Sequence, residues 1–144
     1  MRRTKDRWAL VLVLVALSAC GSSEHAARQF PAPPIDSYSV STLQVRMDGS
    51  PEPLQGATVS REFFKAADVR PFIGRLFDDR EYRIGAPAVV VLDYELWQRR
   101  LRGAPHVIGT VLTLNDRPVT VVGVAEPGFA SPAGVQMWMP RIER

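Results

Sequence analysis

The single cysteine of this sequence is the side chain with the clearest chemistry. Cys20 directly follows Leu17, Ser18 and Ala19, which close an apolar segment that starts at Trp8. The residues before that segment include four basic ones: Arg2, Arg3, Lys5 and Arg7. A positive stretch, a short apolar stretch and then small residues are the order of a secretory signal. This order predicts that the chain is cut before Cys20 and that the thiol of Cys20 is lipidated.

The length of the apolar segment supports this prediction, because a helix that crosses a bilayer needs about 20 residues. Leu17, Ser18, Ala19 and Cys20 resemble the lipobox of bacterial lipoproteins, so palmitate or a similar acyl chain on Cys20 would hold the protein at a membrane. Each buried methylene contributes about 0.8 kcal/mol, and several chains anchor stably. Two alternatives stay open: a secreted protein with a free thiol, and an uncleaved stub of a membrane helix. Gly21 stands where retained lipoproteins usually carry Asp, which favours the outer over the inner membrane.

The charge balance argues against nucleic acid as a partner. Four of the 18 basic residues and one of the 15 acidic residues lie in the first 19 positions, which leaves 14 of each sign. A neutral mature chain offers no basic surface for phosphates. The mature length suits one small domain, and lipidation of Cys20 would exclude a disulfide, so an apolar core must stabilise the fold.

A search for catalytic groups finds only three neighbouring carboxylates, those of Asp78, Asp79 and Glu81. They could serve a small envelope hydrolase as paired acids. The simpler interpretation is a solvated acidic turn, because the flanking residues include three arginines: Arg75, Arg80 and Arg83. His106 has no Cys or second His at ligand spacing, so no metal site is expected. The sequence also has no nucleophile elbow and no phosphate-binding glycine loop, so we expect no catalytic residue and no cofactor.

Arg99, Arg100 and Arg102 form the other charged cluster. They fall at the end of a predicted helix, where positive charge complements the helix dipole for about 0.3–1 kcal/mol per charge. The mature chain has 13 arginines and one lysine, Lys65. Because arginine is enriched at protein interfaces, this cluster is a candidate partner-binding site.

The elements that must position these residues follow from periodicity and turn signals. Alternating or β-branched runs predict six strands, at residues 38–46, 54–59, 86–92, 110–114, 119–124 and 136–139. Two helices are expected, one at 61–67 capped by Ser60 and one at 94–102 capped by Asp93. Pro71 and Gly74 are expected to end the first helix and form a bend. The predicted fold is α+β, with one mixed β-sheet of about six strands and two helices packed on it.

The predicted organisation has three parts. Residues 1–19 are a lipoprotein signal peptide, and residues 20–37 are the lipidated Cys20 and a flexible tether that is polar and rich in turn-forming residues. Residues 38–141 form the domain.

From Tyr38 to about Arg141 the chain resembles the periplasmic core domain of MacB-type ABC transporter permeases. The resemblance depends on ten short stretches in the right order: residues 56–60, 63–64, 69–71, 74–77, 88–92, 96–100, 108–109, 114–115, 117–124 and 127–129. Among them are Ala88-Val89-Val90-Val91-Leu92 and Arg117-Pro118-Val119-Thr120-Val121-Val122-Gly123-Val124. The resemblance implies a domain that is not an enzyme, that contacts partner proteins in the periplasm and that transmits ATP-driven motion.

The chain departs from the family pattern at three positions. Asp68 and Asp116 stand where glycine is favoured, which implies left-handed backbone at some cost, and Ala67 replaces a larger apolar residue. The domain is expected to be partial, with a lipoprotein signal in place of the flanking permease helices and no nucleotide-binding domain.

These observations predict a non-enzymatic, lipid-anchored periplasmic interaction domain that associates with a transport or efflux complex. Its expected partners are the membrane, through the lipid on Cys20, and an ABC permease or other envelope proteins, with no nucleic acid and no small-molecule substrate. A non-functional permease fragment and a small envelope hydrolase are the alternatives.

Overall fold

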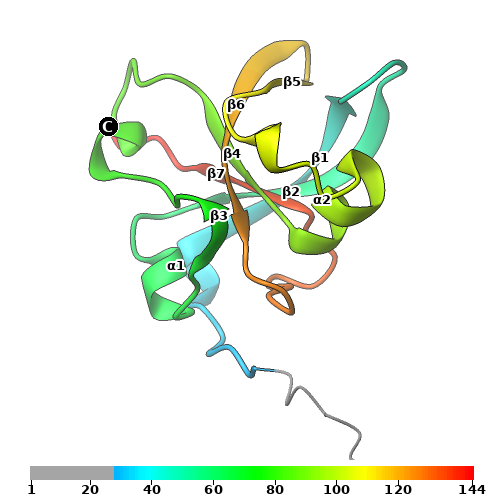
Figure 1. The fold of residues 1–144 in the computed structure, drawn as a ribbon. Helices are drawn as coiled ribbons and strands as arrows, with labels where there is room; N and C mark the ends of the chain where they lie inside the picture. The colour runs from blue at the N-terminus through cyan, green and yellow to red at the C-terminus, as the bar shows by residue number, and fades with distance from the viewer. Residues whose placement is uncertain (1–27) are drawn as a thin grey trace, which may run out of the picture.

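The structure is a computed structural model, and it describes residues 28–144. Its regular elements are, in chain order, β1 (Tyr38–Arg46), β2 (Glu52–Val59), α1 (Phe63–Ala66), β3 (Pro71–Gly74), β4 (Val89–Leu92), α2 (Tyr94–Leu101), β5 (Val111–Leu114), β6 (Arg117–Ala125) and β7 (Met137–Pro140). Three 3₁₀ turns lie between them, at Ile35–Ser37, Asp79–Tyr82 and Pro105–Val107. Figure 1 shows both helices against one strongly curved sheet.

The sheet closes on itself. Its order is β3-β6-β4-β7-β2-β1-β5, and β5 also pairs with β6. At Thr120 of β6 the neighbours are Val89 of β4 on one edge and Val111 of β5 on the other. Six strands therefore form a barrel-like ring, and β3 pairs with the remaining length of β6. The α+β class and the six predicted strands are confirmed, and the closure is a feature that the strand pattern did not predict.

The seventh strand, β3, corrects the expectation of a simple bend at residues 71–74. Pro71 pairs with Ala125 and Gly74 with Gly123, and the register shifts between Pro71 and Ile73. Proline has no N–H to donate to a neighbouring strand, and an edge strand tolerates it because one side of such a strand has no neighbour. Because the strand begins with a proline and ends with a glycine, which are typical of turns, the sequence pattern did not predict it.

Two apolar clusters lie on opposite faces of the sheet. One contains Leu96 and Trp97 of α2, and the other contains Phe63 and Phe64 of α1. β4 contributes alternately to both clusters and is buried along its whole length, as its continuous apolar run predicts. Trp138 is fully buried in the α1 cluster.

β6 contains a bulge that sets which of its side chains face each cluster. Val90 and Val91 of β4 pair with Val121 and Gly123, so Val122 is an extra residue in β6. The side chains of Val121 and Val124 consequently lie in the α2 cluster, and that of Val122 lies in the α1 cluster.

The helix ends agree with the sequence in one case and not in the other. The carboxylate of Asp93 accepts the N–H of Leu96 at 3.1 Å, which confirms the predicted cap of α2. α1 begins at Phe63 after Glu62, and its cap makes no side-chain hydrogen bond, so the predicted Ser60 cap is wrong. The reason is that the backbone carbonyl of Ser60 accepts the N–H of Phe63 in a preceding turn.

The predicted left-handed positions are confirmed. Asp68 has φ of 52°, and Asn115 and Asp116 have φ of 48° and 63°. Two consecutive positive φ values between β5 and β6 are those of a type I′ hairpin turn. Ala67 is fully buried beside Asp68.

Within residues 28–144, neither helix is long and apolar enough to cross a membrane.

Candidate functional site

The predicted arginine cluster lies at the C-terminal end of α2. The side chain of Arg99 is 75% exposed, and its Nε lies 3.7 Å from Glu95 Oε2 one turn earlier. Arg102 ends the helix with φ of 54°. The structure therefore brings Arg99, Arg100 and Arg102 together at one helix end, largely on the surface.

Arg100 differs from its neighbours because it crosses to β2. Its Nη1 donates to Glu52 Oε2 at 2.6 Å. The other carboxylate oxygen, Oε1, is buried and has no hydrogen-bond partner among the described residues. The pair thus satisfies only one oxygen of Glu52, and 43% of the Arg100 side chain stays exposed.

The carboxylates at residues 78–81 are organised as a structural turn. Asp78 Oδ1 accepts the N–H of Arg80 at 2.8 Å, and Glu81 Oε2 accepts the N–H of Asp78 at 3.0 Å. These two bonds form a capping box for the 3₁₀ turn at Asp79–Tyr82.

Glu81 corrects the expectation of a solvated acidic turn. Its side chain is only 8% exposed, and Arg75 donates to both of its oxygens at 2.6 and 3.0 Å. The hydrogen bond to Glu81 raises the pKa of the Arg75 guanidinium despite partial burial. Asp79 lies 3.4 Å from Arg61, so the three carboxylates have different partners and do not face one another as a pair.

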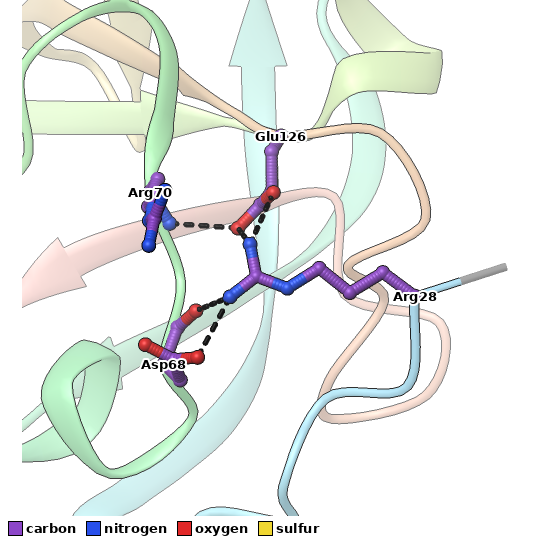
Figure 2. Close-up of polar contacts among 4 residues, drawn as sticks. All are labelled: Arg28, Asp68, Arg70 and Glu126. Carbon is purple, nitrogen blue, oxygen red and sulfur yellow. Dashed lines mark hydrogen bonds and ion pairs between the residues drawn. The ribbon is translucent and has the colours of Figure 1, made fainter.

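A third charged cluster was not predicted, and Figure 2 shows it. Arg28 Nη1 donates to both oxygens of Glu126 at 2.8 Å, and its Nη2 donates to Asp68 Oδ2 at 2.7 Å and to the Asp68 carbonyl at 2.8 Å. Glu126 Oε1 also accepts the N–H of Arg70 at 2.9 Å. We call Arg28, Asp68, Arg70 and Glu126 the Arg28 cluster.

The Arg28 cluster holds the described end of the N-terminal segment against the domain. Desolvation alone would lower the pKa of Arg28, but the hydrogen bond to Asp68 and the charge of Glu126 outweigh it, so the pKa is raised. The guanidinium also lies 5.2 Å from the ring centre of Phe30, which packs edge-on against Phe129. Residues 28–37 were expected to be part of a tether, and in the structure they contact the domain.

No local signal in the sequence identifies the Arg28 cluster. Arg28 lies 40 positions before Asp68 and 98 before Glu126. The one available hint is Phe30, the single aromatic residue in residues 20–37, the segment before β1.

The predicted lipidation site lies outside the described residues. Leu17, Ser18, Ala19 and Cys20 all precede Arg28, so the signal and the lipid remain predictions. Among residues 28–144, the structure places no group of three or more His, Cys, Asp or Glu side chains that could hold a metal ion.

Comparisons with known proteins give a consistent result. The family model of the MacB-like periplasmic core domain matches residues 11–143. The macrolide export ATP-binding/permease protein MacB 2 of Aeromonas hydrophila subsp. hydrophila is 34% identical over 85 residues. That match covers 57% of this chain and 13% of the relative, so the chain corresponds to a small part of that protein.

Two solved structures share the fold. The extracellular domain of the noncanonic ABC-type transporter YknZ from Gram-positive bacteria has a TM-score of 0.60 at 14% identity, over 72% of this chain and 52% of that one. The periplasmic region of MacB from Actinobacillus actinomycetemcomitans has a TM-score of 0.60 at 17% identity, over 72% and 46% of the two chains.

Proposed function

Because the chain belongs to the family of MacB-like periplasmic core domains, we propose that it is a lipid-anchored, non-enzymatic interaction domain of the periplasm that associates with an ABC transporter complex. The observation that carries the proposal is the family match over residues 11–143. The relative from Aeromonas hydrophila is a macrolide export protein, which makes an efflux complex the proposed setting.

The lipid anchor is proposed from the signal at residues 1–20, with the outer membrane as its address. Eight peptide units separate Cys20 from Arg28, and a fully extended chain spans at most about 3.6 Å per residue. The Arg28 cluster would therefore lie within about 30 Å of the lipidated residue. A domain held so close to the outer membrane is in reach of a transport complex that spans the periplasm.

The partner-binding surface is proposed at the end of α2. Among the described residues, the guanidinium groups of Arg99 and Arg102 have no ion pair with another strand or helix, and Arg99 has a weak pair with Glu95 of the same helix. Exposed guanidinium groups suit bidentate hydrogen bonds to carboxylates. The proposed partner is accordingly an envelope protein with an acidic surface.

The anchor is tested by metabolic labelling with a fatty-acid probe. The natural chain should take up the label, and Cys20→Ser should not. An unlabelled natural chain that keeps its first 19 residues would contradict lipid anchoring.

The interaction role is tested by mild crosslinking in intact cells, followed by purification of the chain. An ABC permease or another envelope protein should be recovered with the natural chain, and recovery should fall with the double variant Arg99→Glu/Arg102→Glu. Arg80→Glu is the matched control, because the Arg80 side chain is 86% exposed and its one ion pair among residues 28–144 is 4.0 Å long. Equal loss with both variants would argue against a specific site on α2.

A further inference from the structure

The strand β1 has one edge that is almost entirely unpaired. On one side, β2 pairs with it continuously from Tyr38 to Val45, without a register irregularity. On the other side, β5 pairs only with Val45 and Arg46. The first part of this second edge, from Tyr38 to Leu43, has no neighbouring strand among residues 28–144.

The backbone groups at this edge can be assigned from Gln44. Its carbonyl accepts the N–H of Asn115 at 2.9 Å, and its N–H donates to Asn115 Oδ1 at 2.9 Å, so both groups point away from β2. The residue opposite it in β2 is Pro53, which has no N–H to offer. Because strands alternate with a period of two, Val40 and Thr42 present their N–H and C=O groups at the same edge as Gln44.

This edge lacks the features that usually protect a free strand. Ser39, Val40, Ser41 and Thr42 are exposed on both faces of the strand. The stretch from Tyr38 to Val45 contains no charge and no proline. The strand β3 is different, because it begins with Pro71 and its register is irregular. Charges, prolines and bulges at edges prevent association, and their absence leaves β1 open to another strand.

We propose that the β1 edge pairs with the β1 edge of a second copy of this chain, antiparallel and about a two-fold axis. Such an interface is self-complementary, since each copy offers the same groups. Its outer residues are opposite in charge: Asp36 precedes the strand and Arg46 ends it. Neither side chain has an ion pair within the described residues, and antiparallel pairing brings Asp36 of each copy toward Arg46 of the other.

A pairing centred on Val40 fits the open stretch. Val40 would face its own copy and Tyr38 would face Thr42, which leaves Gln44 bonded to Asn115 as it is in the structure. Directly opposite residues of this kind exchange both backbone hydrogen bonds. The open stretch ends where Asn115 and β5 take up the edge at Gln44, Val45 and Arg46, so Asp36 of one copy lies toward the end of β1 that carries Arg46 in the other copy.

So short an interface is weak between free molecules and gains from anchoring, because two chains on one membrane have a high effective concentration. The gain in effective concentration depends on the proposed lipid anchor, whereas the unpaired edge of β1 is present without it.

The experiment uses the full chain in its membrane and a short bis-maleimide crosslinker. Val40→Cys should give a crosslinked species of twice the chain mass. Ile84→Cys, at a side chain that is 70% exposed in the turn before β4, and the natural chain with Cys20 alone are the controls. Equal yields at Val40 and Ile84, or a product that contains a different protein, would overturn the proposal.

Proline and lysine variants separate edge pairing from mere proximity. In the Val40→Cys background, Thr42→Pro removes an N–H that points away from β2, so the crosslink should be lost while the thermal unfolding midpoint is kept. Ser41→Pro, whose N–H faces β2, should lower the midpoint. Thr42→Lys is the second edge variant, because a charged side chain on an edge strand discourages pairing with another strand. A crosslink that persists in both folded Thr42 variants would overturn the proposal, and fatty-acid labelling of the same variants shows whether the anchor is intact.

Discussion

Arg28 and the arginines of α2 carry the same charged group and meet very different surroundings. Arg28 makes four hydrogen bonds to two acidic residues that are remote in sequence. Arg99 is 75% exposed and has a single partner on its own helix, 3.7 Å away. The arginines of the α2 run can stay at the surface because the helix end already accounts for their position, whereas Arg28 is held by tertiary contacts. The Arg28 cluster is therefore expected to stabilise the fold, and the α2 arginines to remain available to partners.

The largest effect should come from Glu126→Ala. Glu126 accepts hydrogen bonds from Arg28 and from the N–H of Arg70, and its side chain is only 18% exposed. Removing a carboxylate that accepts several bonds should lower the free energy of unfolding by about 2 kcal/mol. Denaturant unfolding of the purified chain measures this change.

Glu126→Gln is the control for that prediction. It keeps an oxygen for the N–H of Arg70 and loses the ion pair with Arg28, so its effect should be smaller than that of alanine. If the two variants were equally destabilised, the backbone bond to Arg70 would contribute nothing, and the cluster would act only through the charge of Arg28.

The next effect concerns the cap that begins α2 and so positions its arginines. Asp93→Ala removes the acceptor for the N–H of Leu96 and should cost about 1 kcal/mol of unfolding free energy. Asp93→Asn keeps an acceptor and should cost much less at pH 7. A loss with Asn as large as that with Ala would show that the charge of Asp93 is required.

The Asp93 variants also predict a pH dependence. Burial raises the pKa of Asp93 above its ordinary value of 3.8, although the N–H of Leu96 opposes the shift. A raised carboxyl pKa gives the folded protein stability that is fully present below pH 3.8 and is lost as the pH rises through the folded-state pKa. The stability of Asp93→Asn relative to the natural chain should therefore increase as the pH rises through that window, which unfolding curves at several pH values measure.

A smaller effect is expected from Arg100→Ala. This arginine is intermediate between Arg28 and Arg99, because it has one tertiary partner, Glu52, and is 43% exposed. An exposed pair of this kind contributes about 0.5–1 kcal/mol. Unfolding free energies of Glu52→Gln and of the double variant complete a double-mutant cycle. A coupling energy of zero would show that Arg100, like Arg99, gains no stability from its ion pair.

The same contrast explains which features the sequence could predict. β1, the cap at Asp93 and the left-handed backbone at Asp116 depend on neighbours in sequence, and they were predicted correctly. The ring closure was not, because β5 must pair with both β1 and β6, and no local pattern encodes two partners for one strand. β3 was missed because Pro71 and Gly74 are signals for breaks as well as for an edge strand.

The candidate sites divide in the same way. The α2 arginines were located from helix spacing alone. The burial of Glu81 was not foreseen, since it depends on Arg75 folding back to neutralise it. The Arg28 cluster was also missed, because its partners come from the α1–β3 turn and from the end of β6.

The smallest effect on stability should come from Arg99→Ala, and this prediction tests the comparison most directly. The pair with Glu95 is one helical turn apart, and such pairs contribute about 0.3–0.5 kcal/mol at most. The unfolding midpoint should hardly change, while Arg99→Glu should reduce the recovery of an envelope partner by crosslinking, because it places an acid where an acidic partner would bind. A clear loss of stability in Arg99→Ala would mean that α2 needs this charge for folding. The structural role would then explain the arginine, and the argument for a partner-binding surface would fail.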